Sequence, residues 1–128
     1  MGASFKELSA WQKAVEMTLC VYKLTGQFPA AERFGLKDQL RRAAVSVASN
    51  IAEGYGRSTT GEYIQFLGNA RGSNCEVETQ LVIAPALGLG DPQEMKKAEN
   101  MCAEVSRLLG ALIKSLRLRP PRSSSLRP

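Results

Sequence analysis

The stretch Gln39–Arg57, QLRRAAVSVASNIAEGYGR, decides the fold. Apolar residues recur in it every three or four positions, the spacing that places side chains on one face of an α-helix. Gly54 and Gly56 then supply residues that commonly end a helix. The predicted buried stripe of this helix is Leu36, Leu40, Ala43, Val47 and Ile51.

Three further helices are predicted by apolar spacing together with start signals. Two of them begin with capping-box spacing, formed by Ser9 with Gln12 and by Thr59 with Glu62. Another begins at Asp91, followed by a proline at the first helical position. The four predicted helices cover residues 9–25, 34–54, 60–88 and 92–117. The predicted buried stripe of the first is Trp11, Ala14, Val15, Thr18, Leu19 and Tyr22.

The fold class follows from these helices and their connections. No segment alternates apolar and polar residues as a half-buried strand does. Connections of roughly 4 to 10 residues favour antiparallel neighbours. We therefore expect one all-α domain over residues 1–118, an antiparallel up-down-up-down four-helix bundle. Residues 119–128 are rich in proline, serine and arginine, which predicts a basic disordered tail.

Composition narrows the function. The chain contains no histidine, the commonest general base and metal ligand, and its three cysteines form no Cys-x-x-Cys pair. We therefore predict no catalytic residues, metal, cofactor or small-molecule substrate. No apolar span reaches about 20 residues and no signal peptide is recognisable, so we expect a cytoplasmic protein without membrane contact. Four arginines and no acid lie between Ser115 and Pro128, so much of the +5 charge belongs to the tail.

The segment Ala43–Ala52 has no formal charge on any side. A surface helix of a monomeric bundle normally turns charged residues toward water. Ala44, Ala48 and Ala52 form a second line of small residues, which we interpret as a contact surface for another subunit. The alternative is a central helix covered by the helix over residues 60–88 and by the N-terminal arm.

The segment Gln39–Arg57 also closely resembles the signature of the 23S ribosomal RNA intervening-sequence proteins. The resemblance covers roughly Phe5 to Leu116. This sequence departs from the family pattern at Asn74, where an apolar residue is common, and at Pro85, which should loosen the end of its helix. Other segments that share the resemblance are Trp11–Ala14, Phe28–Pro29, Phe34–Leu36, Phe66–Leu67, Ala70–Ser73 and Glu76–Leu81.

The resemblance implies an antiparallel four-helix bundle that assembles as a ring of five. The family is similar to the accessory variability determinant of diversity-generating retroelements, a basic pentameric bundle that binds a reverse transcriptase and nucleic acid. It therefore implies a non-enzymatic homo-oligomeric scaffold, a homopentamer, that binds RNA or a nucleoprotein partner. The alternative is a protein-interaction adaptor, for example for a polymerase-like partner, without direct nucleic-acid contact. A hydrolase or nuclease built on carboxylates is disfavoured because histidine is absent.

Basic residues within the matched region are the candidates for nucleic-acid binding, because a guanidinium donates two hydrogen bonds to a phosphate. The alternative is that they form structural ion pairs. The candidates are Arg41, Arg42, Arg57 and Arg71, and their possible partners are Glu53, Glu62, Glu76 and Glu78.

Asn50 and Glu53 lie near the end of the second helix, where asparagine is a poor helix former. We interpret both as structural polar residues whose hydrogen bonds fix the turn at Gly54–Gly56 against the next helix. A catalytic role for Glu53 has no support, because no nucleophile or metal-ligand partner accompanies it at a recognisable spacing.

Overall fold

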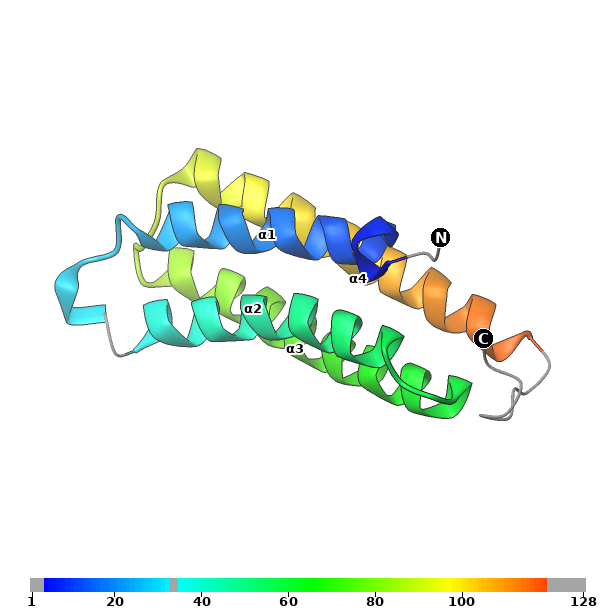
Figure 1. Ribbon diagram of the computed structural model, residues 1–128. Helices are drawn as coiled ribbons and strands as arrows, with labels where there is room; N and C mark the ends of the chain where they lie inside the picture. Colours follow the sequence, from blue (N-terminus) through cyan, green and yellow to red (C-terminus); the bar gives the residue numbers. More distant parts are fainter. Residues whose placement is uncertain (1–3, 33–34, 120–128) are drawn as a thin grey trace.

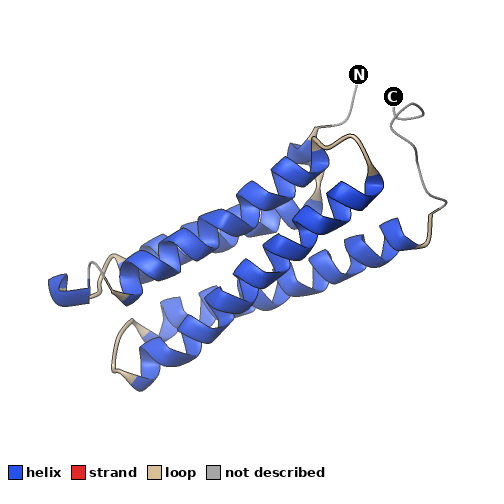
Figure 2. Ribbon diagram, turned by 90° about the horizontal axis from the view of Figure 1, so that it is seen from below, coloured by secondary structure: helices blue, strands red, loops and turns tan. Residues whose placement is uncertain are grey.

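A computed structural model, which describes residues 4–32 and 35–119, consists of four long antiparallel helices (Figure 1). The described part of the chain contains no strand (Figure 2). The long helices are α1 (Ser9–Thr25), α2 (Leu36–Tyr55), α3 (Thr60–Ala86) and α4 (Pro92–Arg117). Two short 3-10 helices, η1 (Phe5–Glu7) and η2 (Ala30–Glu32), flank α1. The chain is therefore all-α, as predicted.

The helix bounds differ little from those predicted. The expected start of the second helix at Phe34 lies outside the described residues, and so does most of the predicted tail, residues 120–128. α3 ends at Ala86, two residues earlier than predicted. Gly88 has a φ of 75°, and the amide of Leu89 donates to the carbonyl of Ala84 at 2.9 Å. This left-handed turn redirects the chain, so α3 does not continue beyond Ala86.

Two of the three predicted caps are present. The carboxylate of Asp91 accepts hydrogen bonds from the amides of Gln93 and Glu94 at 3.0 and 3.1 Å. The hydroxyl of Thr59 accepts from the amide of Glu62 at 3.1 Å. The predicted cap at Ser9 is wrong, because Ser9 is already helical and Leu8 precedes it without a side-chain cap.

The helices pack in a closed square. Each long helix contacts the next one along the chain, and α1 also contacts α4, whereas α1 and α3 lie across the diagonal. The 3-10 helix η1, the end of α4 and the α2–α3 turn lie at one end of the bundle (Figure 1). The α1–α2 and α3–α4 connections lie at the other.

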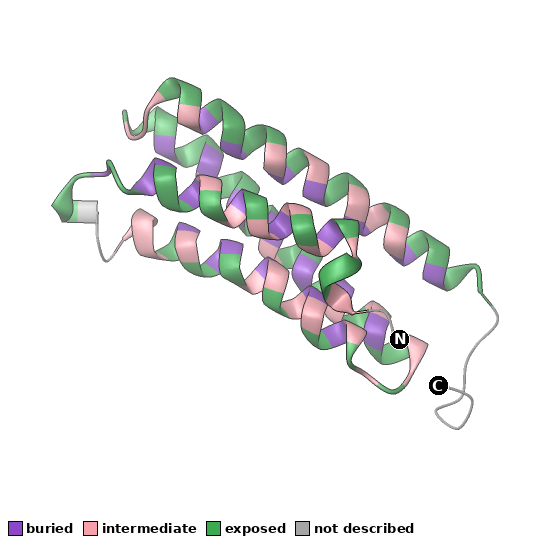
Figure 3. Cartoon of the chain, turned by 45° about the horizontal axis from the view of Figure 1, so that its top comes forward, coloured by how far each residue is buried: buried purple, intermediate pink, exposed green. Residues whose placement is uncertain are grey.

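Buried positions recur along the inner side of each of the four long helices (Figure 3). The core consists mainly of aliphatic side chains, with the aromatic rings of Phe28 and Tyr63, and within the described residues it includes two buried polar residues, Thr25 and Asn74. The hydroxyl of Thr25 donates to the carbonyl of Val21 at 2.7 Å, which satisfies it within α1. The amide of Asn74 donates to the carbonyl of Cys102 at 3.0 Å and so joins α3 to α4. The largest fully buried side chains include Met17, Leu24, Leu40, Ile51, Leu67, Leu81 and Leu109.

Candidate functional site

The main candidate site is an open groove on the outside of the bundle between α1 and α2, called here the α1–α2 groove. No charged residue lines it, and two of its large apolar side chains are well exposed, Leu19 at 65% and Val45 at 42%. Its lining residues are Trp11, Val15, Thr18 and Leu19 of α1 and Val45, Ala48, Ser49 and Ala52 of α2. The bundle therefore exposes a predominantly apolar surface between α1 and α2.

The groove corrects the predicted buried stripe of α1. The structure buries Ala10, Ala14, Met17, Val21 and Leu24, whereas Leu19 and Tyr22 are exposed. Both sets follow helical spacing, because α1 has two apolar sides. The side of α1 that begins at Ala10 packs into the core. The side that begins at Trp11, which carries an aromatic and several branched side chains, therefore faces the groove.

The three alanines proposed as a subunit interface do not share one surface. Ala44 is fully buried, and its carbonyl accepts a hydrogen bond from the Thr18 hydroxyl at 3.1 Å. A second subunit cannot reach it, so its assignment to an interface is wrong. Ala48 and Ala52 are half-buried and line the groove. The small size of these two residues lets the groove form between the larger side chains of α1.

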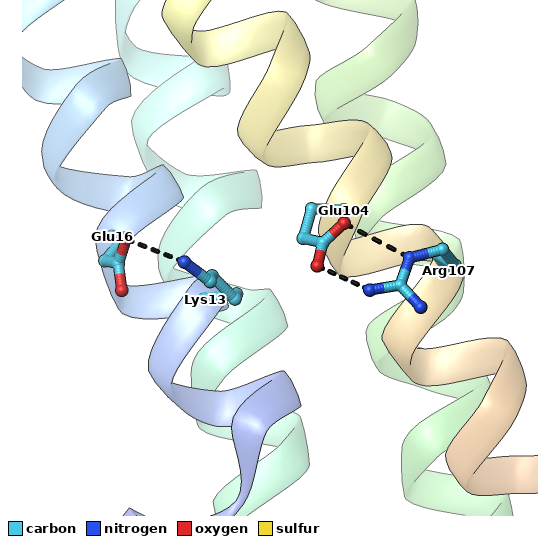
Figure 4. Close-up of polar contacts among 4 residues, drawn as sticks. All are labelled: Lys13, Glu16, Glu104 and Arg107. Carbon is cyan, nitrogen blue, oxygen red and sulfur yellow. Dashed lines mark hydrogen bonds and ion pairs between the residues drawn. The ribbon is translucent and has the colours of Figure 1, made fainter.

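The opposite side of α1, where it meets α4, has the charged character expected of a solvent-facing surface (Figure 4). Lys13 pairs with Glu16 at 3.3 Å, and Arg107 donates to both carboxylate oxygens of Glu104 at 3.2 and 2.6 Å. These hydrogen bonds hold the pKa of Glu104 below its usual value, and the charges of Arg107 and Lys13 act in the same direction. The α1–α2 groove therefore differs from the α1–α4 side of the bundle, because it lacks charged residues.

A row of mostly small and polar residues runs along the side of α3 that faces away from the core, called here the α3 outer face, and Glu76 lies beside it. Its residues are all exposed and recur at helical spacing: Gly61, Gln65, Gly68, Gly72, Cys75, Thr79 and Ile83. A Cβ atom added at any of the three glycines would meet nothing within 4 Å. Glycine in an exposed helix interior costs roughly 1 kcal/mol relative to alanine. No contact within the chain explains why glycine stands there.

Arg41 is a structural residue. Its Nε donates to the Thr25 hydroxyl at 2.7 Å, and a terminal nitrogen donates to the Tyr22 carbonyl at 3.2 Å. Its guanidinium also lies 4.3 Å from the centre of the Tyr22 ring. These contacts tie α2 to the end of α1 and leave Arg41 half-buried at one end of the α1–α2 groove.

The other three candidate arginines are scattered. Arg42 pairs with Asp38 one turn earlier and lines the α2–α3 side of the bundle, opposite to Arg41. Arg57 pairs with Glu53 at 3.2 Å and stacks over a phenylalanine ring. Arg71 is exposed. The four arginines therefore form no common patch on one chain, and of the predicted ion-pair partners only Glu53 is used within the described residues.

Asn50 does not fix the turn at the end of α2 as expected. Its amide donates back to the carbonyl and hydroxyl of Ser46 at 2.9 and 3.0 Å. The Ser46 hydroxyl in turn lies 2.9 Å from that of Ser73, which links α2 to α3. Glu53 does brace the turn through Arg57. The close approach of the turn to α3 depends on Gly54, because a Cβ there would lie 2.7 Å from the Cβ of Phe66.

The end of α4, called here the basic end of the bundle, carries an excess of positive charge. Between Val105 and Arg119 there are four basic residues and no acid, and the first of them, Arg107, is paired with Glu104. The other three are Lys114, Arg117 and Arg119. These residues were not among the four arginines predicted to bind nucleic acid, although the charge run was visible in the sequence.

No group of three His, Cys, Asp or Glu side chains is placed to hold a metal ion in the part of the chain that the structure describes. No helix there is long and apolar enough to cross a membrane. Burial raises the pKa of Cys102 to about 12 and also raises the pKa of Cys20, while Cys75 is exposed.

The fold and surfaces define an antiparallel four-helix bundle with an apolar groove on its outside. The model of the family described as 23S rRNA-intervening sequence protein matches residues 6–111. The chain therefore belongs to this family, which confirms the resemblance carried by Gln39–Arg57.

A solved structure supports the fold. It is described as a protein with unknown function from the S23 ribosomal protein family of Bacteroides thetaiotaomicron, determined at 1.70 Å resolution. It matches with a TM-score of 0.74 and 22% sequence identity, covering 82% of this chain and 98% of that one. At this identity the likeness establishes the fold alone. No curated protein matches the chain.

Proposed function

We propose that the protein is a non-enzymatic homo-oligomeric scaffold that binds RNA or a nucleoprotein complex. The observation that carries the proposal is the α1–α2 groove, where Leu19 is 65% exposed and no lining residue is charged. Burying one large aliphatic side chain contributes roughly 1.5–3 kcal/mol. A second protein surface that covered Leu19, Val45 and Trp11 would therefore gain several such contributions without removing a charge from water.

The basic end of the bundle supports the nucleic-acid part of the proposal. Lys114, Arg117 and Arg119 follow one another at the end of α4 without an intervening acid. In an oligomer each copy would repeat this group, and phosphate binding by several such groups would be strong at low salt.

The nucleic-acid part of the proposal is tested by measuring whether nuclease-treated protein binds added RNA. We expect a fluorescent single-stranded RNA to bind with an affinity that falls steeply as salt rises, because each lost phosphate contact contributes about 0.7 to the slope. Changing Lys114, Arg117 and Arg119 together to glutamine should weaken RNA binding at least about tenfold. It should also make the slope of log affinity against log salt concentration shallower by about 2.

The matched control removes the same charge from the other end of the bundle. Lys37, Lys96 and Lys97 lie near the starts of α2 and α4, and their replacement by glutamine should leave affinity within about threefold. An equal loss in both triple variants would show that binding depends only on net charge. Wild-type protein that retains no RNA at low salt would remove the nucleic-acid part of the proposal.

A protein-interaction adaptor is the second candidate, because the same groove suits an apolar partner surface and Arg41 is already engaged within the chain. Apolar contacts depend less on salt than charged ones. A protein partner that stays bound at high salt, and is released by Leu19→Glu, would favour the adaptor. Retention that is lost on nuclease treatment would favour RNA.

A further inference from the structure

A polar hollow, called here the α2–α3 hollow, lies on the outside of the bundle where α2 and α3 pack side by side (Figure 1). We propose that it binds a guanidinium group, presented by an arginine side chain of a protein partner. This inference goes beyond the proposed function, because it requires neither RNA nor self-assembly. The hollow has a volume of about 520 Å³, which lies in the range of small-ligand sites. Its lining residues are Gln39, Arg42, Ala43, Ser46, Glu76 and Gln80.

The first argument is that two hydrogen-bond acceptors of α3 in this hollow have no donor. The side-chain oxygen of Gln80 is buried and has no hydrogen-bond partner within the described residues. The carboxylate of Glu76 forms no ion pair in that part of the chain either. The two residues are four apart on α3, so their side chains are neighbours on one helix face. Buried polar atoms are nearly always hydrogen-bonded, so this pair favours a ligand that supplies donors.

The second argument is that the amide of Gln80 is held in place by α2. Its nitrogen donates to the side-chain oxygen of Gln39 at 3.3 Å. This hydrogen bond uses the donor of the Gln80 amide and leaves the acceptor as its unpaired end. The hollow therefore presents an oriented acceptor next to a carboxylate.

The third argument is that the charge of the hollow favours a cation. Arg42 pairs with Asp38 one turn earlier on α2, so these two charges offset each other. Glu76 then leaves the hollow with one net negative charge. An anion such as phosphate would be repelled by Glu76, whereas a cation would be attracted to it.

The fourth argument distinguishes a guanidinium from other cations. A guanidinium has five N–H donors in a planar fork, so it can donate to the carboxylate of Glu76 and to the Gln80 oxygen together. An ammonium is a compact, strongly hydrated charge with a less suitable geometry for two acceptors. Free arginine would also bring an ammonium and a carboxylate, and the lining residues offer no second unpaired charge to hold them. The hollow therefore suits an arginine side chain that belongs to a protein.

The probe for the experiment is acetyl-arginine amide, which carries the guanidinium on a capped backbone as a protein does. Isothermal titration calorimetry gives its affinity for the wild-type protein, and the side-chain amide resonances of Gln39 and Gln80 report where it binds. For a ligand of this size we expect a dissociation constant of about 1 mM. Acetyl-citrulline amide has nearly the same shape without the charge and should bind at least about tenfold more weakly.

Three variants locate the binding. Glu76→Gln should weaken the arginine probe at least about tenfold, because it removes the carboxylate that attracts the guanidinium. Glu78→Gln removes the same charge from an exposed residue of α3 that does not line the hollow, and affinity should stay within about twofold. Gln80→Met should weaken binding about threefold or more without lowering the urea midpoint, because it removes an unpaired buried oxygen.

Several results would overturn the inference. Equal losses in Glu76→Gln and Glu78→Gln would show that the probe responds only to net charge, and equal binding of the citrulline probe would show that no guanidinium is recognised. Inorganic phosphate that shifts the Gln80 resonance at a lower concentration than the arginine probe would show an anion site. Free arginine that binds tenfold more tightly than the capped probe would exclude a protein side chain as the ligand. RNA retention and the mass of the wild type are measured separately, so failure here leaves the proposed function standing.

Discussion

Replacing Asn74 with aspartate should destabilise the bundle far more than the loss of one amide nitrogen suggests. Asn74 is only 2% exposed and donates to the Cys102 carbonyl at 3.0 Å, while the Cys102 thiol lies 3.5 Å from the Asn74 side-chain oxygen. Aspartate has nearly the same shape. It would place a negatively charged acceptor where a donor now faces that carbonyl.

The expected magnitude follows from this burial. An uncompensated buried charge costs about 3–5 kcal/mol, so we expect Asn74→Asp to lower the free energy of unfolding by about 3 kcal/mol near pH 7. Asn74→Leu removes the polar pair but fills similar space, and the Cys102 carbonyl remains inside α4 with its helical hydrogen bond. That variant should stay within about 1 kcal/mol of the wild type.

Urea unfolding followed by circular dichroism, at one protein concentration, measures both variants. Burial raises the pKa of the introduced carboxyl in the folded state above its unfolded value of about 3.9. The folded variant therefore binds the proton first as pH falls, and its deficit relative to the wild type should narrow between about pH 7 and pH 5. An Asn74→Asp variant with the wild-type midpoint, or a deficit that widens on acidification, would refute the reasoning.

Three further predictions concern packing and thiol chemistry. Gly54→Ala should cost about 2 kcal/mol in thermal unfolding, although alanine favours helix, because the new Cβ would lie 2.7 Å from the Cβ of Phe66; an unchanged melting temperature would show that the turn can move. Gly90→Ala should also destabilise, since Gly90 has a φ of 92° and a Cβ would lie 2.8 Å from a Leu24 methyl; urea midpoints would register it. In folded protein near pH 8 an alkylating reagent should modify exposed Cys75 and spare Cys102, whose pKa burial raises to about 12; peptide mass mapping that finds Cys102 modified first would contradict this.

The helices themselves could be predicted from the sequence because their signals are local. Asp91 and Thr59 cap their helices as expected. A side-chain oxygen at this position lies next to the unpaired backbone amides of the first turn and readily accepts a hydrogen bond from one of them. Ser9 has the same spacing to Gln12 but does not cap. The chain before it already forms η1, capped by Ser4, and the Gln12 side-chain amide donates to the Lys6 carbonyl instead.

Which apolar side of a helix faces the core could not be predicted in the same way. In α1 the sides that begin at Ala10 and at Trp11 both follow helical spacing, and only the positions of the other helices distinguish them. The larger and more apolar side was expected inside, yet it lies at the groove. A surplus of apolar side chains on two sides of one helix is itself the signal of an outer contact.

The four candidate arginines do not share one surface, and the reason is visible in the sequence. Arg41 and Arg42 are consecutive, and consecutive residues on a helix point about 100° apart. Arg41 accordingly contacts α1, while Arg42 lies on the α2–α3 side. The basic residues at the end of α4 do share one end of the bundle, because they are close together in the sequence.

The mass of the wild-type protein, measured by light scattering after nuclease treatment at low and high salt, tests the central claim most directly. The account predicts a stable mass several times 13.9 kDa, fivefold as the family resemblance implies, and no decrease at high salt because the α1–α2 groove carries no charge. A monomer at both salt concentrations would contradict it and would mean that the groove is not a self-assembly surface.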